Sequence, residues 1–121
     1  MNQPEGYKLL DQINGEQLGS VVFVQDYFQL VFDGPTISIY SNRTTVYSKN
    51  TQSKSWDDQF RNMLCGQIAK IVKRISIDLE KELSIEFRDK SRIVVSLHPD
   101  DQTGPEAIYC HGFSDGEWTV A

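Results

Sequence analysis

Long apolar runs are absent from this chain of 121 residues, and none approaches the ~20 residues that a membrane-spanning helix needs. The first residues also lack a basic segment followed by an apolar stretch, which is the pattern of a secretory signal. We therefore expect a cytoplasmic protein without membrane contacts. Hydrophobic residues make up 39% of the chain. That content and the length predict a single domain over residues 1–121 with one hydrophobic core.

Cysteine and histidine are scarce, with only Cys65, Cys110, His98 and His111 in the chain. Zinc needs three or four ligands at workable spacing, so these scattered residues predict no metal site. Cys110 and His111 are adjacent, and adjacent side chains on a strand point to opposite faces, so they form no local nucleophile–base pair. Both thiols are expected to be reduced, buried or half-buried, and without catalytic purpose.

Signature motifs of common enzymes and cofactor sites are missing as well. Gly15 and Gly19 are not followed by the Lys-Ser/Thr pair of a phosphate-binding loop, and no Gly-x-Ser-x-Gly elbow occurs. Asp100 and Asp101 are carboxylates of the type used in acid–base catalysis, but a loop flanked by prolines favours simple solvation of both. The sequence predicts a protein that is not an enzyme and that needs no cofactor.

Positive charge is missing from the end of the chain. Residues 1–97 hold twelve acidic and twelve basic residues, whereas residues 98–121 hold five acidic residues and no Lys or Arg. These five residues account for the net charge of −5, and they are Asp100, Asp101, Glu106, Asp115 and Glu117. Two interpretations stay open: ordinary solvated surface, or an acidic region that steers a basic partner.

Residues 41–74 have the opposite bias, with seven basic residues against two acidic ones. Lys70, Lys73 and Arg74 lie close together, and aromatic residues occur in the same third of the chain. Such a combination can form a stacking groove for single-stranded nucleic acid. The net charge of −5 opposes binding to a phosphate backbone, so no nucleic-acid partner is expected.

Alternating apolar residues predict an α+β domain dominated by an antiparallel sheet. Residues 7–40 and 56–97 each contain an amphipathic stretch that ends at a glycine, followed by three β-like segments. One interpretation is a duplicated helix–β–β–β unit, and the other is a simple meander of hairpins. In total we expect six to eight strands in a mainly antiparallel sheet, with one or two helices on one face.

Several boundaries follow from local signals. The second helix is expected to begin with Ser55 as its N-cap and to end at Gly66. The apolar pattern also fits a longer helix, so the state of residues 66–75 stays open. Residues 44–47 predict a short edge strand. Residues 107–111 and 117–120 predict two final strands.

The final strands are expected to be neighbours, which would place the five C-terminal carboxylates at one end of the molecule. Trp118 lies among these carboxylates in the sequence, close to Tyr109 and Phe113. Aromatic anchors inside a polar rim are common in protein interfaces. We therefore predict partner binding by Asp100, Asp101, Glu106, Asp115, Glu117 and Trp118. The alternative for the aromatic rings is that they cover the end of the core.

The C-terminal part resembles a group of small bacterial domains. The resemblance rests on Ser96-Leu97-His98-Pro99-Asp100-Asp101, Gly104-Pro105-Glu106-Ala107 and Trp118-Thr119-Val120, together with the turn Phe32-Asp33-Gly34. Some of these domains occur among immunity proteins of polymorphic toxin systems, including contact-dependent growth inhibition. The resemblance carries no catalytic motif.

This resemblance implies an immunity protein that binds and neutralises a cognate toxin domain. An acidic inhibitor would suit a basic toxin, such as a nuclease that must bind phosphate. The alternative is a small non-catalytic domain with another binding or structural role, for example as the subunit of a homo-oligomer. The sequence leaves the partner and the oligomeric state open.

Overall fold

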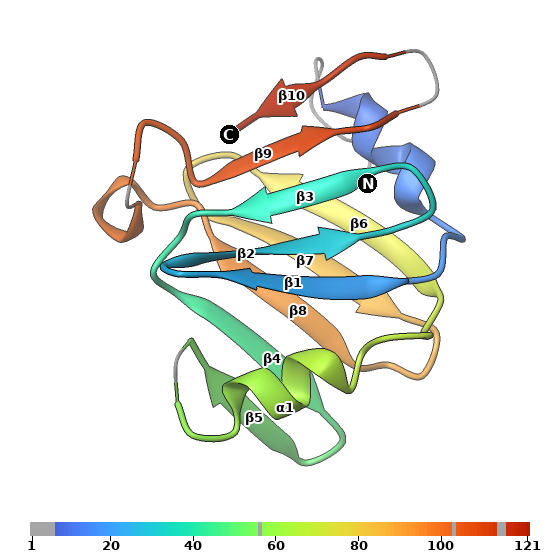
Figure 1. Ribbon diagram of the computed structural model, residues 1–121, viewed down its shortest axis with the longest axis vertical. Coiled ribbons are helices and arrows are strands. Elements are labelled where there is room, and N and C mark those ends of the chain that lie inside the picture. The colour runs from blue at the N-terminus through green and yellow to red at the C-terminus, as the bar shows by residue number, and fades with distance from the viewer. Residues whose placement is uncertain (1–6, 56, 103, 114–115) are drawn as a thin grey trace.

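The computed structural model describes residues 7–55, 57–102, 104–113 and 116–121. Two five-stranded antiparallel sheets pack face to face (Figure 1). Sheet 1 consists of β1 (Ser20–Val24), β2 (Tyr27–Val31), β3 (Thr36–Ile39), β9 (Ile108–His111) and β10 (Thr119–Val120), in that order. Sheet 2 consists of β5 (Thr51–Lys54), β4 (Thr44–Ser48), β8 (Arg92–Ser96), β7 (Glu82–Phe87) and β6 (Val72–Asp78), in that order.

The chain is mostly antiparallel sheet with few helices, as the sequence predicts. The expected six to eight strands are wrong in detail, because the described residues form ten strands in two separate sheets. Residues 7–40 place their three strands in sheet 1, and residues 56–97 place theirs in sheet 2. A short helix precedes the strands in each of these segments.

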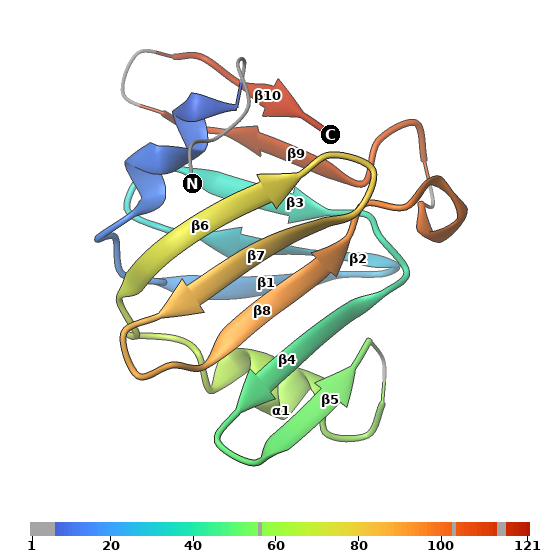
Figure 2. The ribbon, with the colours of Figure 1, turned by 180° about the vertical axis from the view of Figure 1, so that it is seen from behind.

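The helices close the open sides of the sandwich instead of covering one face (Figures 1 and 2). The 3-10 helix η1 (Lys8–Ile13) packs against β6, and the Tyr7 hydroxyl just before it donates a hydrogen bond to the Val120 carbonyl in β10 (2.8 Å). Helix α1 (Phe60–Cys65) contacts β1, β4 and β5 on the other side. A third short helix, η2 (Pro99–Asp101), lies between β8 and β9.

The core lies between the sheets and follows from the period-two pattern of the strands. In β2, Phe28 and Leu30 are buried, and in β7 the same is true of Leu83, Ile85 and Phe87. Helix α1 adds Phe60, whose ring meets that of Phe28 edge-on at 5.7 Å between centroids. The apolar alternation read from the sequence therefore identifies the inward faces of both sheets.

The start of α1 differs from the prediction. Gln59 takes the N-cap position, without a side-chain cap. Ser55 does not cap the helix, because its hydroxyl accepts a hydrogen bond from the Thr44 N–H (2.6 Å) and donates one to the Thr44 carbonyl (3.2 Å). The predicted end at Gly66 is confirmed, but the next strand begins only at Val72.

Strand β4 is also placed differently from the prediction. It pairs with β5 on one side and with β8 on the other, so it is an interior strand. The edge position belongs to β5. Lys54 at the end of β5 is exposed, as suits an edge strand that must avoid pairing with another chain.

Candidate partner-binding surface

Three connections that are far apart in the sequence lie at one end of the sandwich (Figure 1), and each of them carries acidic residues. They come from the β1–β2 turn, from the end of β6 with the β6–β7 turn, and from the β8–β9 connection. We refer to these residues as the acidic end: Asp26, Asp78, Glu80, Asp100, Asp101 and Glu106. Only the last three belong to the C-terminal group that the charge count had identified.

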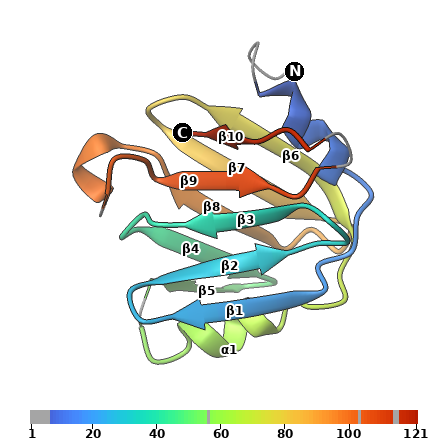
Figure 3. The ribbon, with the colours of Figure 1, turned by 45° about the horizontal axis from the view of Figure 1, so that its top comes forward.

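Backbone hydrogen bonds hold these connections together. The Leu97 N–H donates to the Lys81 carbonyl at 3.0 Å, which joins the β8–β9 connection to the β6–β7 turn. The Asn42 N–H donates to the Asp101 carbonyl at 2.6 Å, which joins it to the β3–β4 connection. Figure 3 shows the β8–β9 connection projecting beyond the strand ends. The carboxylates therefore share one surface because the sheets fix the loops that carry them.

Positive charge does little to balance this end. Lys81 in the β6–β7 turn has its Nζ 4.0 Å from Asp78, and Arg43 in the adjoining β3–β4 connection has its Nε 3.9 Å from Asp101. Both basic side chains are more than two thirds exposed, and exposed ion pairs contribute little free energy. Two basic groups against six carboxylates leave the acidic end with a net negative charge.

The two neighbouring aspartates of η2 have different environments. Asp101 is 19% exposed and accepts a hydrogen bond from the Ser96 hydroxyl (2.6 Å), so it fastens the connection to β8. Asp100 is 89% exposed, and its backbone N–H donates to Nδ1 of His98 (3.2 Å). Of this pair, Asp100 is the residue whose carboxylate is available to a partner.

The structure separates the predicted site residues into two groups. Glu117 and Trp118 lie in the connection between β9 and β10, at the opposite end of that hairpin from Glu106. The reason is that an antiparallel hairpin has its turn at one end and its free ends at the other. The expectation that all five carboxylates share one end is therefore wrong for Glu117, and Asp115 lies outside the described residues.

Trp118 is 62% exposed and does not pack into the core. Its ring lies 6.2 Å from that of Tyr109, and Tyr109 stacks on His111 at 5.0 Å. Phe113, by contrast, is only 4% exposed and belongs to the core. The alternative, in which the rings cover the end of the core, therefore holds for Phe113 and fails for Trp118.

Tyr109, His111 and Trp118 belong to the outer face of sheet 1, which is uncharged in the described part of the chain. Alternation along the paired strands defines the outward positions among the described residues, and Lys, Arg, Asp and Glu occupy none of them. Val22 at 40% exposure is the most exposed of its aliphatic residues. The outward residues are Ser20, Val22, Val24, Tyr27, Gln29, Val31, Thr36, Ser38, Tyr40, Tyr109, His111, Trp118 and Val120.

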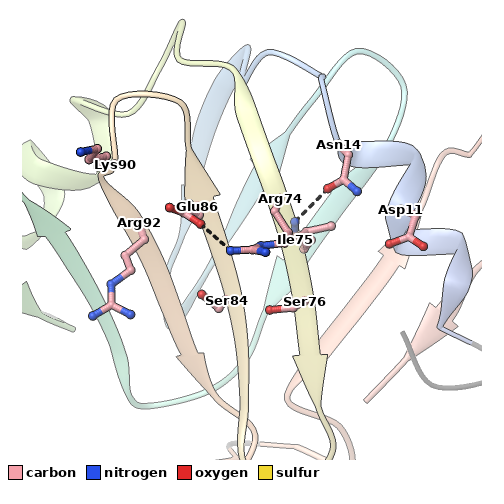
Figure 4. A pocket seen from close by; sticks show the side chains of 9 residues that line it. All are labelled: Asp11, Asn14, Arg74, Ile75, Ser76, Ser84, Glu86, Lys90 and Arg92. Carbon is pink, nitrogen blue, oxygen red and sulfur yellow. Dashed lines mark hydrogen bonds and ion pairs between the residues drawn. The ribbon is translucent and has the colours of Figure 1, made fainter. Parts of the chain in front are cut away.

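The outer face of sheet 2 is charged and carries a broad depression of about 740 Å³ (Figure 4). Arg74 bonds to Glu86 at 3.2 Å across its floor, and the Asn14 side chain accepts a hydrogen bond from the Ile75 N–H at 2.8 Å. Serine hydroxyls are present, but none of the lining residues is a histidine or cysteine. Asp11, Lys90 and Arg92 also line it, so the depression is a polar surface that carries charges of both signs.

The basic stretch of residues 70–74 is partly neutralised. Lys70 Nζ lies 2.8 Å from Asp89 and also donates to Gln67 and Ser91. Hydrogen bonds from Lys70 and from Ser91 lower the pKa of Asp89 to about 2. With Arg74 paired to Glu86, these residues form separate ion pairs and not a continuous basic groove.

The cysteines differ from each other more than the sequence suggests. Cys110 is fully buried in β9, and burial raises the pKa of its thiol to about 12. Cys65 is exposed at the end of α1, so the expectation that it is buried or half-buried is wrong. Both thiols are free. The described residues contain no group of three or more His, Cys, Asp or Glu side chains placed to hold a metal ion.

No protein-family model matches the sequence, and no solved structure matches the fold. None of the helices in the described ranges combines the length and the apolar character that crossing a membrane requires.

Proposed function

We propose that this protein is an immunity-type inhibitor, which binds a basic toxin domain through the acidic end and catalyses no reaction. The observation that carries the proposal is the meeting of six carboxylates from three separate connections on one surface. Like charges repel, so the fold itself gains no stability from collecting them. A basic partner would gain from their common field.

The scaffold suits such a role. Both sheets support the loops of the acidic end, and their hydrogen bonds leave little conformational freedom to lose on binding. Complementary charge raises the rate at which two proteins meet and discriminates against partners of the wrong sign. The C-terminal resemblance to immunity proteins of polymorphic toxin systems agrees with this role, since the resembling segments include Asp100, Asp101 and Glu106.

A growth-protection experiment tests the proposal. Where a toxin-bearing gene lies next to the gene for this protein, its C-terminal domain is coexpressed with the chain. We expect the wild-type chain to restore growth. The variant Asp26→Lys/Asp100→Lys/Glu106→Lys should fail to do so, because its acidic end repels a basic domain. All three side chains lie at the surface, so this variant should still fold, which a circular dichroism melt will check.

The matched control is Asp11→Lys/Asp33→Lys/Glu117→Lys, which changes the net charge equally at exposed positions away from the acidic end. It should protect as the wild type does. The proposal is overturned if the wild-type chain neither protects against that toxin domain nor binds it.

A second candidate function is self-association through the outer face of sheet 1. Trp118 is 62% exposed there, and the face is uncharged in a chain with net charge −5. Two copies could meet on this face without bringing like charges together. Sedimentation velocity tests it: a dimer at micromolar concentration that Trp118→Glu converts to monomer would support this function. A monomer for the wild-type chain at every concentration would contradict it.

A further inference from the structure

A small pocket lies within the acidic end, between the β1–β2 turn and the β8–β9 connection. Its volume is about 310 Å³. That is at the lower end of the range for ligand pockets, which suits one side chain better than a larger ligand. The residues that line it are Asp26, Tyr27, Tyr40, Gly104, Pro105 and Glu106.

Two tyrosines form the aromatic wall of this pocket. Tyr27 begins β2 and Tyr40 follows β3, and the pairing of Phe28 with Ile39 places the tyrosines opposite each other. Their ring centroids lie 4.9 Å apart with a tilt of 37°. The Tyr40 N–H also donates to the Ala107 carbonyl at 2.7 Å, which holds Glu106 beside the rings. The sheet therefore fixes the wall before any ligand binds.

The carboxylates of the pocket differ from several others in the molecule, which have side-chain partners. Asp101, Glu86 and Asp89 are all engaged by side-chain hydrogen bonds or ion pairs. The side chains of Asp26 and Glu106 form neither with any residue in the described part of the chain. Two acidic groups without a partner thus border a pocket with an aromatic wall.

This combination of groups is the chemistry that recognises a guanidinium. A carboxylate accepts two parallel N–H bonds from it, and its flat face stacks on an aromatic ring. A ring face also attracts positive charge, and the aliphatic part of the side chain can cover the ring. The two carboxylates would repel an anionic ligand, and the tyrosine hydroxyls are the only side-chain donors among the described residues that line the pocket.

We propose that the pocket receives an arginine side chain of the partner, with Asp26 and Glu106 accepting its N–H groups and the tyrosines packing against its guanidinium. The identity of the partner as a basic toxin domain rests on the proposed function. The preference of the pocket for a guanidinium rests on its own geometry, so the two can be tested separately.

The first test titrates N-acetyl-arginine amide into the ¹⁵N-labelled full chain. Binding is measured by NMR, from the chemical shifts of the backbone amides. We expect weak binding, with shifts concentrated at the amides of Asp26, Tyr27, Tyr40, Gly104 and Glu106. N-acetyl-citrulline amide has nearly the same shape without the charge, and it should give no saturable shift. Equal shifts from both probes, or no localised shift, would overturn the pocket.

Two further probes test which cationic group the pocket prefers and whether the rest of the arginine side chain contributes to binding. N-acetyl-lysine amide should bind more weakly than the arginine probe, because an ammonium cannot stack or form the paired bonds. Ethylguanidinium carries the head group alone and should also bind more weakly, because it lacks the rest of the side chain. Ethylguanidinium binding as tightly as the arginine probe would identify a free organic cation as the ligand and contradict the proposal.

The second test uses Asp26→Asn/Glu106→Gln, which removes both charges and keeps the size of the side chains. Binding of the arginine probe should weaken about fivefold or more. The control Asp78→Asn/Glu80→Gln removes the same charge from the same end, outside the pocket, and should weaken binding less than about twofold. Equal weakening by the two variants would mean that only the general field acts, and the pocket proposal would fail.

The same two variants separate this proposal from the proposed function when the toxin domain is the ligand. If both weaken its binding equally, the acidic end stands and the pocket fails. A different result is that neither variant weakens binding of the toxin domain, while the wild-type chain still binds the arginine probe at the pocket. The pocket then stands as a guanidinium site, and the proposed function fails.

Discussion

The variant Gly112→Ala is expected to lose about 3 kcal/mol of the free energy of unfolding. Gly112 has a φ of +83°, which L side chains rarely adopt, and a Cβ there would overlap the carbonyl oxygen of Gly34. The contact joins the β2–β3 turn to the beginning of the β9–β10 connection. Relief of the overlap would require the backbone of one turn to move, because neither partner is a flexible side chain.

Two other glycines separate the causes of this loss. Gly15 also has a positive φ (+86°) but has no atom within 4 Å of an added Cβ, so Gly15→Ala should cost about 1 kcal/mol. At Gly104 the added Cβ would meet open space, and the φ of this residue is outside the left-handed region. Gly104→Ala should therefore change stability by less than about 0.5 kcal/mol. Urea denaturation measures the free energy of unfolding of all three variants, and equal m-values make the three values comparable. A loss for Gly112→Ala no larger than that for Gly15→Ala would contradict the account of the contact.

The strands could be predicted because their signal is local. Phe28 and Leu30 in one segment, and Leu83 and Ile85 in another, alternate with polar residues and face the core, as the pattern indicates. The division into two sheets has no such signal. It depends on the pairing of β3 with β9 and of β4 with β8, which joins segments separated by a large part of the chain.

Tertiary contacts also explain the errors at single residues. Ser55 has the sequence context of an N-cap, but its hydroxyl is taken by the backbone of Thr44 on a neighbouring strand. Cys65 has apolar neighbours in the sequence, yet α1 is only six residues long and buries just Phe60 and Leu64 fully. A short helix at the side of a sandwich has one narrow buried stripe, and Cys65 lies outside it.

The candidate site could be predicted only in part. Asp100, Asp101 and Glu106 are recognisable from the charge count, because no basic residue follows them. Asp26, Asp78 and Glu80 look like ordinary polar turn residues, and only the strand pairing brings them to the same end. Glu117 shows the opposite error: it is near Glu106 in the sequence, and the β9–β10 hairpin carries it away. Proximity along a chain is a poor guide to proximity across a sandwich.

Reversal of charge at the acidic end is expected to slow association with the toxin domain about tenfold or more at low salt. Steering acts over about 10 Å at an ionic strength of 0.1 M, so the effect should shrink as salt rises. The dissociation rate of the complex should change less than the association rate. The change that remains should come from the loss of the pocket contacts of Asp26 and Glu106. Folding should be unaffected or slightly more favourable, because the variant removes repulsion between carboxylates.

The central claim is that the acidic end forms the interface, and stopped-flow association at two salt concentrations tests it most directly. The partner is the toxin domain from the growth experiment. Asp26→Lys/Asp100→Lys/Glu106→Lys should lose most of the rate at low salt, while Asp11→Lys/Asp33→Lys/Glu117→Lys should stay within about twofold of the wild type. If the two variants slow association equally, only the net charge matters, and if the second alone slows it, the interface lies elsewhere. Either result would contradict the claim.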